Sequence, residues 1–315
     1  MSVALGARST VSVVMGPTAA GKSAVAMHLA ERYRVAIISA DSRQIYTGFD
    51  IGTAKPDRAD RQRVPHYGID VLAPGMRYSA HQWAEDAVRW SAAAHTQGRE
   101  PLIVGGTGFY VRALINPLDE MPRLEPARRA ALEPWLATLD GEELERWCRR
   151  LDPLRASLGR TQRLRAVETA LLAGRRISEW PLVDDGSRHP SACVARYLVV
   201  DPGSVLAHRI VRRVDAMIAA GWFDEVRSLM QHVSSDAPAW KASGYARIRD
   251  AVAGVLSPEQ AVERVIIETR QYAKRQRTWY RHQLPHTHVT YLDSSSPDAL
   301  RQACAWWESD KGTDP

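Results

Sequence analysis

The sequence predicts an α/β protein with a parallel-sheet core and an all-helical insertion in the middle of the chain. Short β-branched runs alternate with longer amphipathic stretches in the first and last parts of the sequence, a pattern typical of parallel strands joined by right-handed crossovers. Between these parts no strand pattern occurs. We therefore predict an α/β core of residues 10–116 and 195–308 and a helical insertion of residues 117–194.

The first predicted strand, residues 11–15, is followed by the pattern G-x-x-x-x-G-K-[ST] and then by a predicted helix at residues 23–30. This order is typical of a P-loop, because glycines let backbone N–H groups turn inward and the helix N-terminus adds positive potential. Lys22 supplies a charge, and the Ser23 hydroxyl can ligate Mg²⁺. The predicted phosphate-binding residues are Gly16, Pro17, Thr18, Ala19, Ala20, Gly21, Lys22 and Ser23.

The motif predicts a P-loop-containing nucleoside triphosphate hydrolase-like core, with an ordinary glycine-rich turn as the alternative; it does not identify the phosphates. Other core strands are predicted at residues 35–40, 102–104, 197–200 and 289–292, and other core helices at 78–97, 204–220, 224–233 and 258–282. Ligands of such sheets bind at the carboxyl ends of the strands. We therefore expect Gly16, Asp41 and Thr107 to lie together at the carboxyl edge of the sheet.

The insertion is predicted to hold three helices, at residues 125–139, 142–151 and 161–172. Positive charge is concentrated in two segments, one in this insertion and one in the last predicted helix of the core. Residues 146–176 contain nine arginines and two acidic residues, a local charge of +7 (9 − 2), and residues 264–282 contain six basic residues and one acidic residue, +5 (6 − 1). Such concentration is typical of a surface that binds a polyanion. A solvated helical face is the alternative.

Asp41 is a candidate proton acceptor, because it follows the strand at residues 35–40 and would lie beside the bound phosphates. The alternative is a helix N-cap. A P-loop hydrolase usually needs an acidic residue at the end of a core strand, yet the strand at 102–104 ends in Gly-Gly-Thr. Asp201 follows another strand, but it precedes Pro202 and fits a turn. These observations weaken a hydrolase interpretation.

The apolar runs and the cysteine content of the sequence indicate the cellular location that we expect for the protein. No apolar run approaches the about 18 residues that a membrane helix needs, and the N-terminal residues lack the apolar core of a signal peptide. The three cysteines are few and far apart, which argues against a disulfide framework. We therefore expect a cytoplasmic protein without a membrane segment. No heptad pattern or apolar stripe requires a partner, so a monomer is expected.

Several segments together make the chain resemble the tRNA dimethylallyltransferase (isopentenyltransferase) family, of the bacterial type. The matching segments are residues 16–23 (GPTAAGKS), 38–46 (ISADSRQIY), 50–56 (DIGTAKP), 65–70 (PHYGID), 105–110 (GGTGFY) and 269–279 (TRQYAKRQRTW). They occur in the order of the family over about residues 12 to 293. The combination is highly specific, although the P-loop alone is not.

The resemblance implies an enzyme that transfers the dimethylallyl group of dimethylallyl diphosphate to N6 of the adenosine just 3′ of the tRNA anticodon, with Mg²⁺ and release of diphosphate. The P-loop would hold the diphosphate, with Thr107 and Arg213 helping Lys22 and Ser23 to stabilise it. Asp41 would accept the N6 proton. The residues implied around the extruded adenine are Asp41, Ser42, Arg43, Gln44 and Thr107.

The resemblance also gives the basic segments a partner, the anticodon stem-loop. Arg270, Lys274, Arg277 and Arg281 recur at helical spacing and should share one face that contacts phosphates; a salt-bridged surface is the alternative. The residues of the insertion expected to clasp the anticodon arm are Arg129, Arg163 and Arg165.

Two positions depart from the family pattern. Gln162 stands where a basic residue is usual, and Ala246 and Arg247 follow Gly244-Tyr245 where many relatives have Gln or Glu. Both lie in parts expected to face RNA.

Three other functions remain open: a P-loop small-molecule kinase, an adenylate isopentenyltransferase that acts on free nucleotide, and an RNA-binding protein without catalysis.

Overall fold

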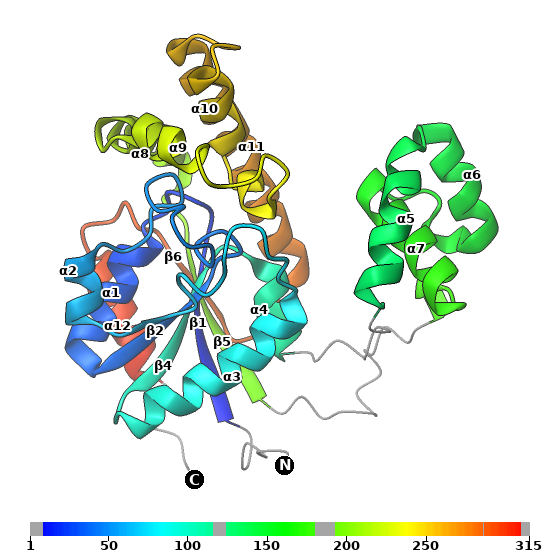
Figure 1. Cartoon of the computed structure of the whole chain (residues 1–315). Helices are drawn as coiled ribbons and strands as arrows, with labels where there is room; N and C mark the ends of the chain where they lie inside the picture. Colours follow the sequence, from blue (N-terminus) through cyan, green and yellow to red (C-terminus); the bar gives the residue numbers. More distant parts are fainter. Residues whose placement is uncertain (1–8, 116–123, 180–192, 286, 310–315) are drawn as a thin grey trace. The chain divides into compact units, whose positions relative to one another are not determined.

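The computed structural model of the 315-residue chain describes residues 9–115, 124–179, 193–285 and 287–309 (Figure 1). The chain divides into two compact units. Residues 1–116 and 192–315 form an α/β unit, and residues 117–191 form a second unit that contains only helices among its described residues. Within the described ranges, no helix has both the length and the apolar character needed to cross a membrane.

The α/β unit contains a six-stranded parallel sheet with the order β3-β2-β4-β1-β5-β6. Its strands are β1 (Ser9–Met15), β2 (Val35–Ala40), β3 (His66–Tyr67), β4 (Glu100–Gly105), β5 (Cys193–Val200) and β6 (Val289–Leu292). The central strands are runs of β-branched residues because helices cover both faces of the sheet. The predicted parallel sheet is confirmed, and the two-residue strand β3 was not predicted.

The register of the sheet brings several strand ends to one edge. Gly105 is paired with Met15 of β1 and with Ala40 of β2, so these three strands end together. A Cβ atom on Gly105 would lie 2.1 Å from the Ala40 carbonyl oxygen. Only glycine allows this approach, and the loops that follow β1, β2 and β4 consequently begin side by side.

Nine helices are described in the α/β unit. They are α1 (Lys22–Tyr33), α2 (Arg58–Arg63), α3 (Ala80–Thr96), α4 (Gly108–Ile115), α8 (Leu206–Ala219), α9 (Trp222–Leu229), α10 (Tyr245–Val252), α11 (Pro258–Gln283) and α12 (Ala299–Glu308), with 3₁₀ turns at Gly203–Val205 and Pro238–Lys241. Ser257 and Gln260 form a capping box that fixes the start of α11. The sequence did not predict α2, α4, α10 or α12.

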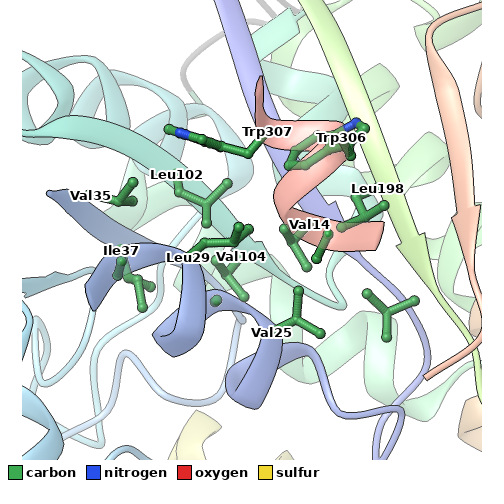
Figure 2. Close-up of a cluster of buried hydrophobic side chains, with 14 of the residues drawn as sticks. Val14, Val25, Leu29, Val35, Ile37, Leu102, Val104, Leu198, Trp306 and Trp307 are labelled. Atoms are coloured by element: carbon green, nitrogen blue, oxygen red, sulfur yellow. The ribbon is translucent and has the colours of Figure 1, made fainter. Parts of the chain in front are cut away.

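One core cluster lies between the sheet and the helices α1 and α12 (Figure 2). Leu29 of α1 and the adjacent tryptophans Trp306 and Trp307 of α12 pack against strand residues such as Val14. The Arg196 guanidinium donates to the Trp306 and Trp307 carbonyl oxygens at 2.8 and 3.2 Å. This buried arginine therefore fixes the last helix to β5.

A second core cluster supports the loop that follows β2. Phe49 of that loop packs between Trp240 and Tyr245. The Tyr245 hydroxyl accepts a hydrogen bond from the Gly52 N–H and donates one to Glu225. The loop after β2 is thus held by α9 and α10.

The helical unit has its own small core. Its elements are α5 (Pro126–Thr138), α6 (Gly141–Leu151), α7 (Arg160–Ala173) and 3₁₀ turns at Pro153–Arg155 and Ile177–Glu179. Leu144 and Cys148 of α6 are buried against Ala166 and Val167 of α7. The three helices predicted for this part of the chain are therefore confirmed.

Candidate active site

A cavity of about 380 Å³ opens at the carboxyl edge of the sheet. Its walls come from the P-loop, from the loops after β2 and β4, and from α8 and α11. The polar side chains that matter for its chemistry are those of Lys22, Ser23, Asp41, Arg213, Tyr272 and Gln276. The fold thus brings together residues that are up to 254 positions apart in the sequence (276 − 22).

The P-loop joins β1 directly to α1. Its first glycine, Gly16, is in close contact with the backbone of β5, because a Cβ atom there would lie 2.1 Å from the Val200 carbonyl oxygen. Gly21 precedes α1 with φ +96° and provides no side-chain cap. The first N–H groups of α1 therefore have no capping side chain, which is the arrangement that binds an anion.

Lys22, Arg213 and Asp41, which all line the cavity, interact electrostatically with one another. Burial and the neighbouring Arg213 lower the pKa of Lys22 to about 8, against an opposing effect of Asp41. Burial also lowers the pKa of Arg213, and Asp41 again opposes the shift. Two positive groups held close together in a protein interior favour the arrival of an anion, because an anion stabilises their charged forms.

The Asp41 side chain belongs to a turn. Its Oδ1 atom accepts a hydrogen bond from the Arg43 N–H at 2.9 Å, and residues 42–45 form turns instead of a helix. The alternative role as a helix N-cap is therefore wrong. The Thr107 hydroxyl accepts a hydrogen bond from the Ser42 N–H at 3.1 Å, so the predicted residues Asp41 and Thr107 do come together.

Gln44 braces the same loop. Its side-chain oxygen accepts from the Ser39 hydroxyl at 3.0 Å, and its amide nitrogen donates to the carbonyl oxygens of Thr53 and Ala54 at 3.2 Å each. Gln44 and Arg43 both line the cavity. Both ends of the Gln44 amide already have protein partners, so its contribution to the site includes holding the loop in shape.

The basic residues predicted on one face of α11 differ in their exposure and in their partners. Arg270 and Lys274 are exposed. Arg277 instead turns toward the end of β5, where it donates to the Asp201 carboxylate at 2.8 Å and to the Gly203 carbonyl oxygen at 2.7 Å. The sequence did not predict this ion pair. It did place Asp201 in a turn, where the carboxylate accepts a hydrogen bond from the Gly203 N–H at 2.9 Å. Tyr272 lines the cavity, and burial together with Asp41 raises its pKa to about 12.

Two of the three arginines of the helical unit that were predicted to bind RNA form hydrogen bonds within the protein. Arg129 donates two hydrogen bonds to Glu168, at 2.6 and 3.0 Å. Arg163 contacts Glu145 and the Gly141 carbonyl oxygen, at 3.3 Å each. Burial, then the charge of Arg129, lowers the pKa of Arg165. Arg129 and Arg163 thus form ion pairs within the helical unit.

The two departures from the family pattern have structural explanations. Gln162 accepts a hydrogen bond from the Gly159 N–H at 3.2 Å and caps the start of α7. Arg247 binds Glu268 of α11 at 2.7 Å and Asp250 at 3.2 Å. The first residue therefore stabilises a helix end, and the second ties α10 to α11.

Sequence reasoning missed two residues of α11 that form hydrogen bonds with the P-loop, Gln276 and Tyr280. Both lie on the buried side of α11 together with Ala261, Val265, Thr269 and Ala273. The spacing of three and four residues between them was a usable signal, because it places them on one helix face. The basic residues of α11 instead predicted a functional face on the exposed side of the helix.

The cavity offers few protein ligands to a metal ion. Among the described residues there is no group of three or more His, Cys, Asp or Glu side chains that could hold one. The Ser23 hydroxyl and the Asp41 carboxylate do line the cavity. Mg²⁺ is commonly bound by one or two protein oxygens together with substrate phosphates and water, so this donor set fits a Mg²⁺ that binds with a diphosphate.

Family models and curated relatives match most of the chain. A family model described as IPP transferase matches residues 44–283, and one described as isopentenyl transferase matches residues 9–67. The chain is 36% identical over 302 residues to a protein named tRNA dimethylallyltransferase from Cyanothece sp., across 95% of this chain and 97% of the relative. It is 41% identical over 280 residues to a protein of the same name from Bordetella pertussis, across 85% and 88%.

Solved structures resemble the chain over nearly its whole length. The tRNA delta(2)-isopentenylpyrophosphate transferase of Staphylococcus epidermidis matches with a TM-score of 0.66 and 28% identity, covering 96% of this chain and 99% of that one. The tRNA isopentenylpyrophosphate transferase of Bacillus halodurans matches with a TM-score of 0.66 and 30% identity, covering 97% and 98%. A eukaryotic dimethylallyltransferase acting on tRNA has the same fold, with a TM-score of 0.77 at 23% identity.

Proposed function

The chain belongs to the IPP transferase family, and we propose that it transfers a dimethylallyl group from dimethylallyl diphosphate to N6 of the adenosine 3′-adjacent to the tRNA anticodon. One observation carries this proposal. The cation pair Lys22 and Arg213 and the carboxylate of Asp41 line the same cavity, so a diphosphate leaving group and a nucleophile that must lose a proton can be held at once.

The reaction replaces one bond with another. N6 of the adenosine attacks the allylic carbon C1, the C1–O bond breaks, and its electron pair leaves on the diphosphate. Negative charge grows on the bridging oxygen as the bond breaks, so groups aimed at that oxygen stabilise the transition state more than the ground state. The positions of Lys22 and Arg213 in the cavity lining, and the absence of a capping side chain at the start of α1, support this task for them.

The proton that N6 loses goes to Asp41 in this proposal. The N–H of Arg43 binds one oxygen of the carboxylate and so orients it. An aromatic amine is a weak nucleophile. A positioned carboxylate and the alignment of N6 with C1 should therefore contribute more to the rate than a covalent enzyme intermediate would. Thr107 supports this side of the site through its hydrogen bond with the Ser42 N–H.

The proposed metal ion is Mg²⁺, held by the Ser23 hydroxyl and the diphosphate oxygens. When bound, it supplies positive charge that the leaving diphosphate requires. The support is the donor set of the cavity, in which Ser23 follows Lys22 at the start of α1.

The proposed acceptor is a base swung out of the anticodon loop, since an adenine within the loop stack cannot reach C1. Arg270 and Lys274 are exposed on α11 and can contact RNA phosphates. We assign the anticodon arm to the helical unit as well, where Arg165 is exposed and can contact RNA phosphates. We further propose that the enzyme acts as a monomer, since Lys22, Asp41 and Arg213 of a single chain line one cavity.

The proposal is tested by supplying the protein with Mg²⁺, dimethylallyl diphosphate and one of three acceptors. The acceptors are unmodified tRNA, AMP and ATP. The expected result is a prenyl mass gain on adenosine in tRNA alone. A gain on AMP would identify an enzyme for free nucleotides, and ATP turnover without transfer would identify a P-loop kinase or hydrolase. Either result would replace the proposed function.

A further inference from the structure

Gln276 of α11 contacts two loops of the active site at once. Its side-chain oxygen accepts a hydrogen bond from the Thr18 N–H of the P-loop at 2.9 Å, and its amide nitrogen donates to the Gly106 carbonyl oxygen at 3.0 Å. The residue is only 7% exposed. A Cβ atom on Gly106 would lie 2.3 Å from the Gln276 amide nitrogen, so this contact depends on a glycine at that position.

The two loops belong to different halves of the proposed reaction. Thr18 belongs to the loop that holds the diphosphate. Gly106 precedes Thr107, whose hydroxyl accepts from the Ser42 N–H next to Asp41. A continuous series of contacts therefore runs from the donor side of the cavity to the acceptor side, and the Gln276 amide is the link between them.

Tyr280 strengthens the same link one turn further along α11. Its single O–H is shared between the Gly16 carbonyl oxygen at 2.8 Å and the Gly106 carbonyl oxygen at 3.2 Å. The side chain is 3% exposed, and burial raises its pKa, so the hydroxyl keeps the proton that it donates. The neighbouring Arg277 fixes this part of α11 to Asp201 at the end of β5.

We propose that Gln276 is a positioning residue for prenyl transfer, which sets the spacing between the P-loop and the Asp41 side of the cavity. The proposal rests on the proposed function, because it assigns a task within that reaction. Attack of N6 on C1 requires the two atoms to be about 3–3.5 Å apart and aligned, and a misplacement of about 1 Å can reduce the rate about 10²-fold. A side chain that bonds both loops controls that distance.

The main test is Gln276→Met, which keeps the length of the side chain but removes both hydrogen bonds. We expect kcat for transfer to tRNA to fall by about 10- to 100-fold. The KM for tRNA should stay within about twofold of wild type, because the loss falls on the transition state and not on ground-state binding. The matched control is Gln302→Met at an exposed position of α12, which should retain the wild-type kcat.

A second variant, Gln276→Glu, gives a readout that a purely structural residue would not produce. The ionised carboxylate still accepts from the Thr18 N–H but cannot donate to the Gly106 carbonyl oxygen. When the introduced carboxyl is protonated, the donor returns. The ratio of the variant kcat to the wild-type kcat should therefore rise as the pH is lowered, and this measurement also decides the matter if Gln276→Met does not fold.

A wild-type kcat in Gln276→Met, or a raised KM for tRNA at unchanged kcat, would overturn the positioning role. A ratio for Gln276→Glu that does not change with pH would do the same. The proposed function fails in a different way, because wild-type protein would then transfer no prenyl group to tRNA under any of these conditions.

Discussion

Arg209 and Arg213 lie one helical turn apart on α8; Arg209 contacts the P-loop, and Arg213 lines the cavity. The Arg209 guanidinium donates to the Ala20 carbonyl oxygen of the P-loop at 3.2 Å and to the Ser294 carbonyl oxygen at 2.8 Å. Arg213 lines the cavity, where its charge acts on Lys22. One helix thus contacts the P-loop with the first arginine and lines the cavity proposed for the diphosphate with the second.

Replacing Arg213 with Gln should reduce kcat/KM for transfer by about 10²- to 10³-fold, because a charge aimed at the leaving group is lost. The comparison is Arg212→Gln, an exposed neighbour on the same helix. Steady-state transfer to an anticodon stem-loop measures both. Equal losses in the two variants would show that Arg213 acts through the general charge of the surface and not through the cavity.

Donor binding should take up a proton near pH 8. The pKa of Lys22 in the free protein is lowered to about 8, so Lys22 is mostly charged at pH 7 and mostly neutral at pH 9. An anionic diphosphate favours the charged form, and affinity for it should weaken as the pH rises through about 8. Calorimetry of diphosphate binding at pH 8.5 in buffers of different ionisation enthalpy measures the uptake. Lys22→Met should abolish it, and an equal uptake in that variant would contradict this assignment.

The loop after β2 should tolerate no side chain at Gly52. A Cβ atom there would lie 2.2 Å from the Trp222 indole ring, so Gly52→Ala overpacks the contact between the loop and α9. We expect a loss of about 1–3 kcal/mol of unfolding free energy, measured by urea unfolding with tryptophan fluorescence. Gly75→Ala, where nothing lies within 4 Å of the new Cβ, should change stability by no more than about 0.5 kcal/mol. Similar losses at both positions would refute the packing argument.

Asp70 should contribute to acid sensitivity. Burial raises its pKa, but hydrogen bonds from Lys55 and Arg61 outweigh burial and hold the pKa below its ordinary value. A carboxyl with a lower pKa in the folded state stabilises the protein above its unfolded pKa of about 3.9, and that contribution is lost as the pH falls through the folded value. The urea concentration at the unfolding midpoint should decrease as the pH is lowered below about 4. The decrease should be less steep in Asp70→Asn than in wild type. Parallel curves would argue against the contribution.

The sequence was sufficient where local patterns decide structure. The P-loop, its flanking strand and helix, and the long α11 all follow from motif, periodicity and capping. The helices α4 and α12 were not predicted because their eight and ten residues give short patterns that only packing resolves. The strand β3 is fixed by pairing with Ile37 and Ile38 of β2, a partnership between distant segments that no local pattern shows.

The site was predictable only in part for the same reason. Asp41, Lys22 and Thr107 follow strands, so the edge rule for parallel sheets places them together. Their partners depend on side-chain direction in three dimensions. The sequence places Arg277 on a basic helix face but cannot show that it turns to Asp201, and it places Gln276 among basic residues without showing the two loops that it joins.

The most direct test of the account is the single-turnover rate of prenyl transfer in Asp41→Asn, with the enzyme mixed with dimethylallyl diphosphate and an anticodon stem-loop. The substitution keeps the size of the side chain but removes its ability to accept the N6 proton. We predict a rate lower by about 10²- to 10⁴-fold, with stem-loop affinity nearly unchanged. A rate within about tenfold of wild type would contradict the role of this carboxylate as the proton acceptor.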